Sequence, residues 1–295
     1  MLDRASTFAE PGIVAMLRTK FVPVAIDQAY QRRQQDAEGE FYRRIAGQGP
    51  RKNFKNTTQG FYVAGADGTL LFYNNNRDPG KVRRLMEEAL AEYEARPAKA
   101  IERGAPDERY NPKPPDGGLV IRVRSRIPEG YEPTEDRWKR ILQEATSRDN
   151  MWVSKAEHEA LVRGSFPRSL AERLCRFHLV DSTRGEPSMW KADEIRMMDL
   201  RLDRGVLRGL VDLKEANGER SFRTSILGYV EVAEGRVTRF DCVAKGSFTG
   251  EGRYTKGAPK GTFPLVVTFE LADGSDVADA IPPQGSRGWV PGYIR

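Results

Sequence analysis

The chain has 295 residues, of which 39% are hydrophobic and 31% charged, and its formal net charge is +6 at pH 7. This length predicts about two domains, and the composition excludes a mainly disordered chain. No apolar run approaches the roughly 18 residues of a membrane span, and the first residues lack the basic and apolar parts of a signal peptide. We therefore expect a cytoplasmic protein with no membrane partner, and export only if the natural N-terminus is longer.

The first 47 residues predict a helix, a strand and a second helix. Residues 5–20 carry apolar side chains at helical spacing, and residues 34–47 do the same before a glycine that is typical of a helix end. Between them, Phe21–Asp27 is short, apolar and rich in β-branched residues, which favours a strand buried on both faces. Pro23 counts against a central position in a sheet, because proline has no N–H to donate.

Residues 60–76 predict a β-hairpin, with its tight turn at Ala66–Gly68. Asp78 and Pro79 then predict the start of a helix, since aspartate caps the first turn and proline suits the first helical position. Apolar residues at helical spacing continue this helix to about Ala95.

Two stretches within residues 5–95 resemble thioredoxin-like proteins of the thiol-disulfide class. STFAEPGIVAMLRTKFVPVAID (6–27) is similar to the segment that follows the family's active-site motif, and TTQGFYVAGADGTLLFY (57–73) is similar to its hairpin. The resemblance implies an α/β thioredoxin-like N-terminal domain over residues 1–96.

The family's reactive residues are absent here. The Cys-x-x-Cys motif would lie at or before Asp3–Ser6 and the family's cis-proline near Thr58 or Gln59, but neither place carries the expected residue. Thiol–disulfide exchange needs a thiolate of lowered pKa and usually a second thiol. The resemblance therefore implies a reduced domain that lacks the first central strand and is redox-inactive. A truncated thiol-disulfide oxidoreductase is the alternative, which an upstream Cys-x-x-Cys would establish.

Residues 97–118 predict a linker, because proline, glycine and charged residues dominate them. Beyond it, residues 119–295 predict an α+β domain that begins with a half-buried strand at Leu119–Ile127. Helices are expected over 134–147, 154–164 and 169–177.

From Ile195 onward the pattern changes to strands of regular spacing with turns between them. It predicts an antiparallel meander, either a curved sheet or a partial barrel. The expected strands are 195–203, 206–215, 220–232, 236–246 and 262–271.

Cys175 and His178 form the first candidate site. They stand three residues apart at the end of a predicted helix and would share a face. With Asp181 close behind, they have the residue types of a metal site, or of a nucleophile and its base. The alternative is that they only pack the helix against the sheet. Cys242, the other cysteine, is too far away in sequence to indicate a disulfide framework.

The second candidate site is the dense polar segment 178–190. Its arginine stands between two carboxylates, an arrangement that suits recognition of a carboxylate or phosphate. The alternative is a structural loop whose side chains cap backbone groups. The glycine-rich segment 245–261 adds cations but lacks the spacing of a phosphate-binding loop. The candidate ligand-binding residues are Asp181, Arg184, Glu186, Trp190, Arg253 and Lys256.

The sequence favours a non-catalytic binding or interaction protein, because the thioredoxin-like pattern lacks its thiols. We expect no catalytic residue and no cofactor, a ligand site between the sheet and the 178–190 loop, and an unidentified protein or small molecule as partner. Charges of mixed sign without a basic stripe disfavour a nucleic-acid partner. The alternative is a metalloprotein or thiol-dependent enzyme centred on Cys175 and His178.

Overall fold

The computed structural model describes residues 6–93, 97, 102 and 104–295. Its contacts divide the chain into two compact units. The sheet unit comprises Pro114–Ser286 and Val290–Arg295, and the N-terminal unit comprises the described residues up to Lys113 together with Arg287–Trp289. Ala95, where a helix end is predicted, and most of residues 97–103 of the predicted linker lie outside the described residues.

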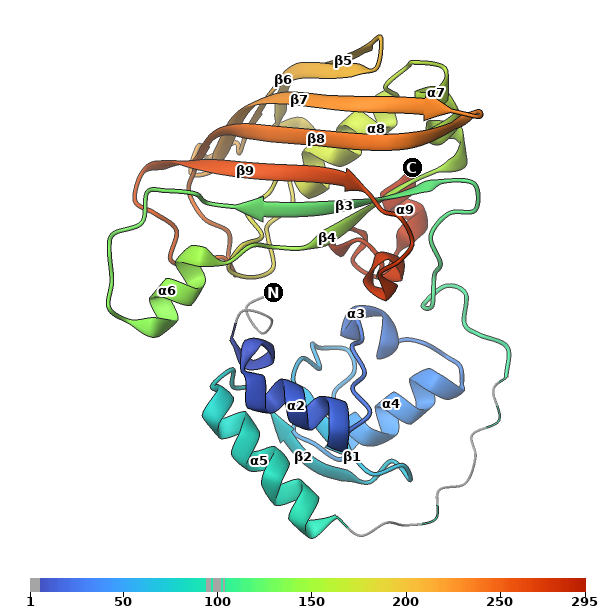
Figure 1. The fold of residues 1–295 in the computed structure, drawn as a ribbon, viewed down its shortest axis with the longest axis vertical. Coiled ribbons are helices and arrows are strands. Elements are labelled where there is room, and N and C mark those ends of the chain that lie inside the picture. The colour runs from blue at the N-terminus through green and yellow to red at the C-terminus, as the bar shows by residue number, and fades with distance from the viewer. Residues whose placement is uncertain (1–5, 94–96, 98–101, 103) are drawn as a thin grey trace. The chain divides into compact units, whose positions relative to one another are not determined.

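The sheet unit is built on a seven-stranded antiparallel sheet of order β4-β3-β9-β8-β7-β6-β5 (Figure 1). The last five strands follow one another along the chain, which confirms the predicted antiparallel meander. The sheet is open, because β4 and β5 are its two ends. The strands are β3 (Leu119–Arg126), β4 (Asp149–Val153), β5 (Ile195–Asp203), β6 (Val206–Lys214), β7 (Ser221–Ala233), β8 (Arg236–Thr249) and β9 (Thr262–Leu271).

Two tight turns set the register of the meander. Arg204 and Gly205 join β5 to β6 with φ angles of 47° and 78°, and Glu234 and Gly235 join β7 to β8 with φ angles of 52° and 73°. Positive φ at both central residues is the mark of a type I′ turn, whose twist matches that of the two strands it connects. Each turn therefore fixes which residues of its two strands face each other.

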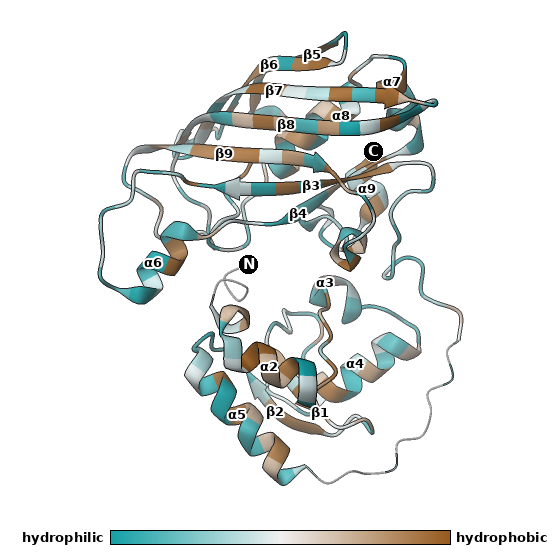
Figure 2. Cartoon of the chain, viewed as in Figure 1, coloured by the Kyte–Doolittle hydropathy of each residue, from teal (hydrophilic) through white to brown (hydrophobic). Residues whose placement is uncertain are grey.

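Apolar and polar residues alternate along the strands, and the apolar residues form one buried face of this sheet. Every second residue of β7 from Phe222 to Val230 is buried, and Figure 2 shows the matching alternation of apolar and polar residues along the long strands. Helices α7 (Lys155–Val162) and α8 (Arg168–Arg173) cover the buried face, where Leu161 and Leu170 join its core. Each such fully buried apolar side chain stabilises the fold by about 1.5–3 kcal/mol.

Three features of this unit differ from the sequence prediction. Strand β4 was not expected, because DNMWV has no alternation and four of its five residues are buried. Helix α6 (Arg137–Glu144) is shorter than predicted and is capped by Asp136. Helix α8 ends at Arg173, and a single π-helical turn, Leu174–His178, follows it.

The N-terminal unit contains short helices and one hairpin. Helices α4 and α5 begin at Asp36 and Asp78, whose carboxylates accept backbone N–H groups as the sequence predicts for Asp78. A small apolar core joins α2, α5 and the hairpin around Ile13, Val82 and Met86. The described elements are η1 (Thr7–Ala9), α2 (Pro11–Lys20), α3 (Gln28–Gln31), α4 (Ala37–Gly47), β1 (Phe61–Ala64), β2 (Leu70–Asn74) and α5 (Pro79–Glu92).

The predicted buried strand Phe21–Asp27 is wrong. The segment pairs with no strand in the described part of the chain, and its Val22 and Val24 are 90% and 74% exposed. Pro23 has no N–H for a ladder, and β1 and β2 pair only with each other. The apolar run that suggested burial therefore lies at the surface of its unit, and the thioredoxin-like assignment remains a prediction. Within the described residues, no helix combines the length and apolar character needed to cross a membrane.

Candidate functional site

Asp181 and Arg184 form an ion pair in the interior of the sheet unit. Their side chains are 2% and 1% exposed, and Arg184 Nη2 donates to Asp181 Oδ2. The guanidinium also donates to the Tyr131 hydroxyl at 2.7 Å and to the Thr255 carbonyl at 3.0 Å. Asp181 Oδ1 accepts from the Thr183 hydroxyl at 2.7 Å. The pair is bonded on several sides, so it ties the 178–190 loop to the 250–261 loop.

Trp190 is also part of the interior. Only 1% of it is exposed, and its Nε1–H donates to the Leu179 carbonyl at 2.7 Å. The guanidinium of Arg220 lies 3.9 Å from the centre of its ring, which is a favourable cation–π arrangement. Arg220 in turn pairs with Glu215 at 3.0 Å. Trp190 therefore anchors the end of the loop against the sheet.

The other predicted ligand-binding residues lie at the surface. Glu186 and Arg253 are exposed, with the Arg253 guanidinium 5.2 Å from the centre of the Tyr254 ring. Lys256 Nζ lies 2.9 Å from Glu251 Oε1, so its charge is already paired. Since Asp181, Arg184 and Trp190 are buried, the structure does not bring the six residues onto one ligand-facing surface.

The π-helical turn separates Cys175 from His178. A π-helical turn is wider than an α-helical one, so the three-residue spacing no longer places both side chains on one face. His178 Nε2 lies 2.5 Å from the Tyr293 hydroxyl, and its Nδ1 lies 3.3 Å from Asp149 Oδ2. The imidazole is buried between these two residues. It is therefore not placed to act as a base for Cys175.

The Cys175 thiol is fully buried, and this burial, with Glu172 as a smaller cause, raises its pKa to about 12. A nucleophilic or metal-bound cysteine reacts as the thiolate, which this environment disfavours. Cys242 is likewise buried, and both cysteines are free thiols. Among the described residues, no three His, Cys, Asp or Glu side chains come together as a metal site, so Cys175, His178 and Asp181 do not form one.

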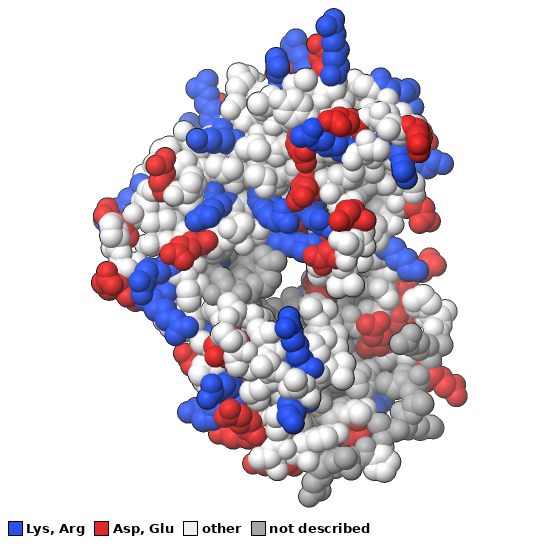
Figure 3. Space-filling view, viewed as in Figure 1, with Lys and Arg blue, Asp and Glu red and all other residues white. Residues whose placement is uncertain are grey.

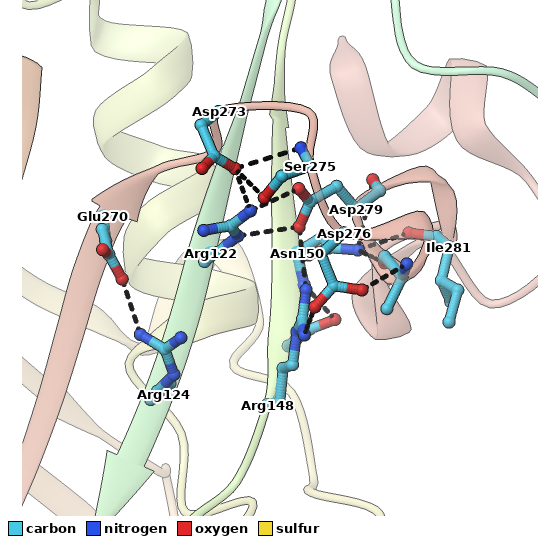
Figure 4. Close-up of polar contacts among 12 residues, drawn as sticks. Arg122, Arg124, Arg148, Asn150, Glu270, Asp273, Ser275, Asp276, Asp279 and Ile281 are labelled. Carbon is cyan, nitrogen blue, oxygen red and sulfur yellow. Dashed lines mark hydrogen bonds and ion pairs between the residues drawn. The ribbon is translucent and has the colours of Figure 1, made fainter.

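A dense charge network joins Arg122 of β3 and Arg148, the residue before β4, to aspartates that follow β9 (Figure 4). Arg122 donates to both Asp279 carboxylate oxygens, at 2.9 and 2.8 Å, and Arg148 Nη2 lies 2.8 Å from the same carboxylate. Asp273 and Asp276 complete the network at 2.5 Å from Arg122 and Arg148. Hydrogen bonding to Asp279, with further contributions from Asp273, raises the pKa of Arg122. Its arginines are matched by carboxylates, so the network holds the segment after β9 in place.

A basic pocket of about 750 Å³ lies in the N-terminal unit, and the sequence did not predict it. It is built from three segments: the end of α3 with α4, the turn 52–55, and Tyr110, which belongs to the predicted linker but packs with this unit. No carboxylate lines it. Its lining residues are Arg32, Arg33, Gln35, Arg43, Lys52, Asn53, Phe54, Lys55 and Tyr110.

Arg32 contributes a buried N–H group to this pocket. Its Nη1 donates to Gln28 Oε1 at 2.6 Å, but its Nε is buried and has no hydrogen-bond partner among the described residues. Burial, followed by the charge of Arg33, lowers the pKa of Arg32. A buried donor without a partner costs about 1–3 kcal/mol. An anion in the pocket would accept this N–H and would offset the charge of Arg33.

The pocket is held together by Asp107 and Asp36. The Gln35 N–H donates to Asp107 Oδ2 at 2.7 Å, and the Asp107 N–H donates to Asp36 Oδ2 at 2.8 Å. Asp107 Oδ1 also accepts the Tyr110 N–H at 3.3 Å, which positions that residue over the pocket. Arg43 Nη1 donates to the Gln34 carbonyl at 2.5 Å, so its charge supports the wall without a carboxylate partner in the pocket.

The sequence carried only a faint signal of this pocket. Arg32–Arg33 and Lys52–Lys55 are short basic clusters, but they are about 20 residues apart and are separated by a helix. Spacing alone could not show that they converge. Comparison with models of protein families, with curated proteins and with solved structures gave no match to this chain.

Proposed function

We propose that this protein is a non-catalytic binding protein whose N-terminal unit binds a small phosphorylated molecule in the basic pocket. The observation that carries the proposal is Arg32, a partly desolvated cation with an unpartnered buried N–H, in a pocket lined by four further cations and no carboxylate. Arg and Lys together are the side chains that proteins use to hold phosphate groups, because guanidinium and ammonium groups donate charge-assisted hydrogen bonds.

The rest of the lining suits the remainder of such a ligand. Phe54 and Tyr110 supply ring surfaces, and Asn53 and Gln35 supply amide groups. Binding sites commonly combine apolar walls with a few polar groups that fix orientation. A molecule that joins phosphate to a planar ring would use both parts of the pocket.

The proposal excludes thiol chemistry for the N-terminal unit, since neither cysteine of the chain lies in its sequence range. We also retain the reduced thioredoxin-like fold as a proposal for this unit. Its support is the order of hairpin β1–β2 followed by a capped helix α5, in the places where the resemblance expects them.

Calorimetric titration of the full chain with pyrophosphate, ADP and citrate tests the proposal. We expect pyrophosphate and ADP to bind, ADP more tightly because of its ring, and citrate to bind more weakly. Lys52→Glu and Lys55→Glu should each weaken pyrophosphate binding about tenfold, since each replaces an attraction by a repulsion. Both lysines are exposed, so these variants should keep the fold.

Lys81→Glu is the matched control, because Lys81 is an exposed lysine of the same unit on α5, outside the pocket. It changes the net charge by the same amount and should leave binding unchanged. Absence of heat with all three probes, or equal loss in the Lys81 variant, would contradict the proposal.

A further inference from the structure

The two edge strands of the large sheet, β4 and β5, differ in what lies beside them. Beside β4, Asn150 Nδ2 donates to the Ala278 and Ile281 carbonyls at 2.7 and 2.9 Å, and the charge network of Figure 4 holds the same segment. Beside β5, by contrast, no hydrogen bond from the described residues reaches the side that faces away from β6. An open edge of nine residues is a template for pairing with another strand.

The turn at Arg204–Gly205 determines which backbone groups of β5 are free. In a two-residue type I′ turn the flanking residues, Asp203 and Val206, form a hydrogen-bonded pair. Hydrogen-bonded pairs alternate along an antiparallel ladder, so the N–H and C=O groups of Met198, Leu200 and Leu202 point away from β6. These three residues present the free edge.

The same three residues lie at the margin of the core. Met198, Leu200 and Leu202 are each partly buried and pack against the core cluster, and β5 pairs with no strand other than β6 in the described chain. A strand that brings apolar residues beside them would extend the core across the edge. A strand that pairs with this edge must therefore carry a row of apolar side chains on one face.

The other face of β5 carries charge. Asp199 and Arg201 point to the outer face of the sheet, with their side chains 56% and 81% exposed. A pocket of about 460 Å³ lies over this face at the hairpin, with further charged residues in its lining. Positive and negative side chains adjoin at the top of Figure 3, where Figure 1 places β5 and β6. Asp199 and Arg201 bond each other at 2.9 Å, and a partner strand that places a base opposite the acid and an acid opposite the base would extend this pairing.

A second copy of β5, antiparallel to the first, meets both requirements. Apolar rows coincide only in registers that pair even-numbered residues with even-numbered ones. When Leu200 faces the second copy's Leu200, Asp199 faces the second copy's Arg201, and the reverse holds across the twofold axis. A shift by one step in either direction places Asp199 opposite Asp199, or Arg201 opposite Arg201, and like charges directly opposite are destabilising.

We propose that two copies of this chain associate through β5, in the register centred on Leu200, to form one continuous sheet. In this arrangement Met198 packs beside the second copy's Leu202, and the free backbone groups of both edges pair. The interface is isologous, as expected for a twofold dimer. A contact made mainly by one strand of nine residues from each copy is small, so we expect an affinity of about 1–100 µM.

Sedimentation velocity of the full chain over about 1–200 µM tests the proposal. Wild type should pass from monomer to dimer. Asp199→Arg and Arg201→Asp should each weaken dimerisation about tenfold or more, since each creates two like-charge contacts. A mixture of these two variants should dimerise again, because one chain then carries arginine at both positions, the other carries aspartate at both, and every arginine faces an aspartate.

Arg239→Asp is the matched control. Arg239 bonds Asp241 two residues away and is exposed like Arg201, but it lies on β8, an interior strand. This variant should dimerise like wild type. A wild type that stays monomeric, single variants that dimerise normally, or a mixture that stays monomeric would each overturn the proposal.

Discussion

The guanidinium of Arg184 and the carboxylate of Asp181 pair three residues apart in the chain, with side chains only 1% and 2% exposed. A buried pair of this kind gains little over apolar residues of the same size, because both charges have lost their water. Breaking one half is costly, since it leaves the other charge uncompensated. The pair therefore specifies how the 178–190 loop lies.

Asp181→Leu should destabilise the protein by about 3–5 kcal/mol, because Arg184 would remain buried without its partner. The double variant Asp181→Leu/Arg184→Met should recover much of this loss. Urea unfolding followed by circular dichroism measures both. Glu172→Ala removes the exposed pair with Arg168 and should cost at most about 1 kcal/mol. A single variant as stable as the control would mean that Asp181 does not hold the loop.

Arg173 should hold the C-terminal helix α9 (Val290–Ile294) to the sheet unit. It is 2% exposed, pairs with Glu157 at 2.6 Å, and donates to the Tyr293 carbonyl at 2.9 Å and to the Ile294 carbonyl. Burial alone would raise the pKa of Glu157, but Arg173 and the hydrogen bonds from Ser169 and Ser154 together outweigh it, and the pKa is lowered.

Arg173→Met should therefore release α9 and cost about 3–5 kcal/mol, since the Glu157 carboxylate loses its partner. Hydrogen exchange measured by mass spectrometry should show faster exchange in the last residues of the chain. Arg168→Met, a change at an exposed position of the same helix, should leave that exchange as in wild type. Unchanged exchange in both variants would show that α9 is held by other contacts.

The two thiols should be unreactive in the folded protein. Burial is the main cause that raises the pKa of Cys175 and of Cys242 to about 12. Thiol reagents attack the thiolate, so native protein at about pH 8 should react slowly, and denatured protein should react at both thiols per chain. Rapid reaction of one thiol in native protein would indicate a reactive cysteine and restore the enzyme hypothesis.

The same thiols predict a loss of stability at alkaline pH. Their pKa is higher in the folded than in the unfolded chain, so their contribution is complete below about pH 8.5 and falls as the pH rises towards 12. Each thiol should lose about 1.4 kcal/mol per pH unit in this range. Urea midpoints measured at increasing pH should fall less steeply in the Cys175→Ala/Cys242→Ala variant than in wild type. Equal slopes would contradict the assignment.

Ligand binding in the basic pocket should depend on salt. Lys52 and Lys55 are exposed, and salt screens the attraction of exposed charges for an anion. Pyrophosphate affinity should fall at least about fivefold between low and roughly 0.5 M NaCl. Affinity that is independent of salt would place the anion at a buried site instead.

The meander could be read from the sequence because its signals are local. The alternation of apolar and polar residues and the paired residues Arg204–Gly205 and Glu234–Gly235 act within a few positions of each other. Strand β4 has no such pattern, because its residues Asn150–Val153 are all buried. It is a strand because it pairs with β3. The residues of one segment alone do not reveal this pairing.

The candidate sites were harder to predict from the sequence than the fold, for a related reason. Cys175 and His178 have helical spacing, but the π-helical turn rotates them apart. Asp181 and Arg184 have the composition of a ligand site, but their charges satisfy each other in the interior. The cations of the basic pocket come from separate segments, and their convergence depends on tertiary structure. Phe21–Asp27 shows the opposite error, an apolar run that the described chain leaves exposed.

The pairing of β3 with β9 has a consequence for the order of folding during synthesis. Ile121 faces Leu271, so about half the chain separates the two strands. The β5–β9 meander joins neighbours in sequence and forms through local contacts, which are fast. The β3–β4 hairpin must wait for β9 to leave the ribosome, with its strand edges exposed meanwhile. Docking of this hairpin should therefore be a late and slow step of folding.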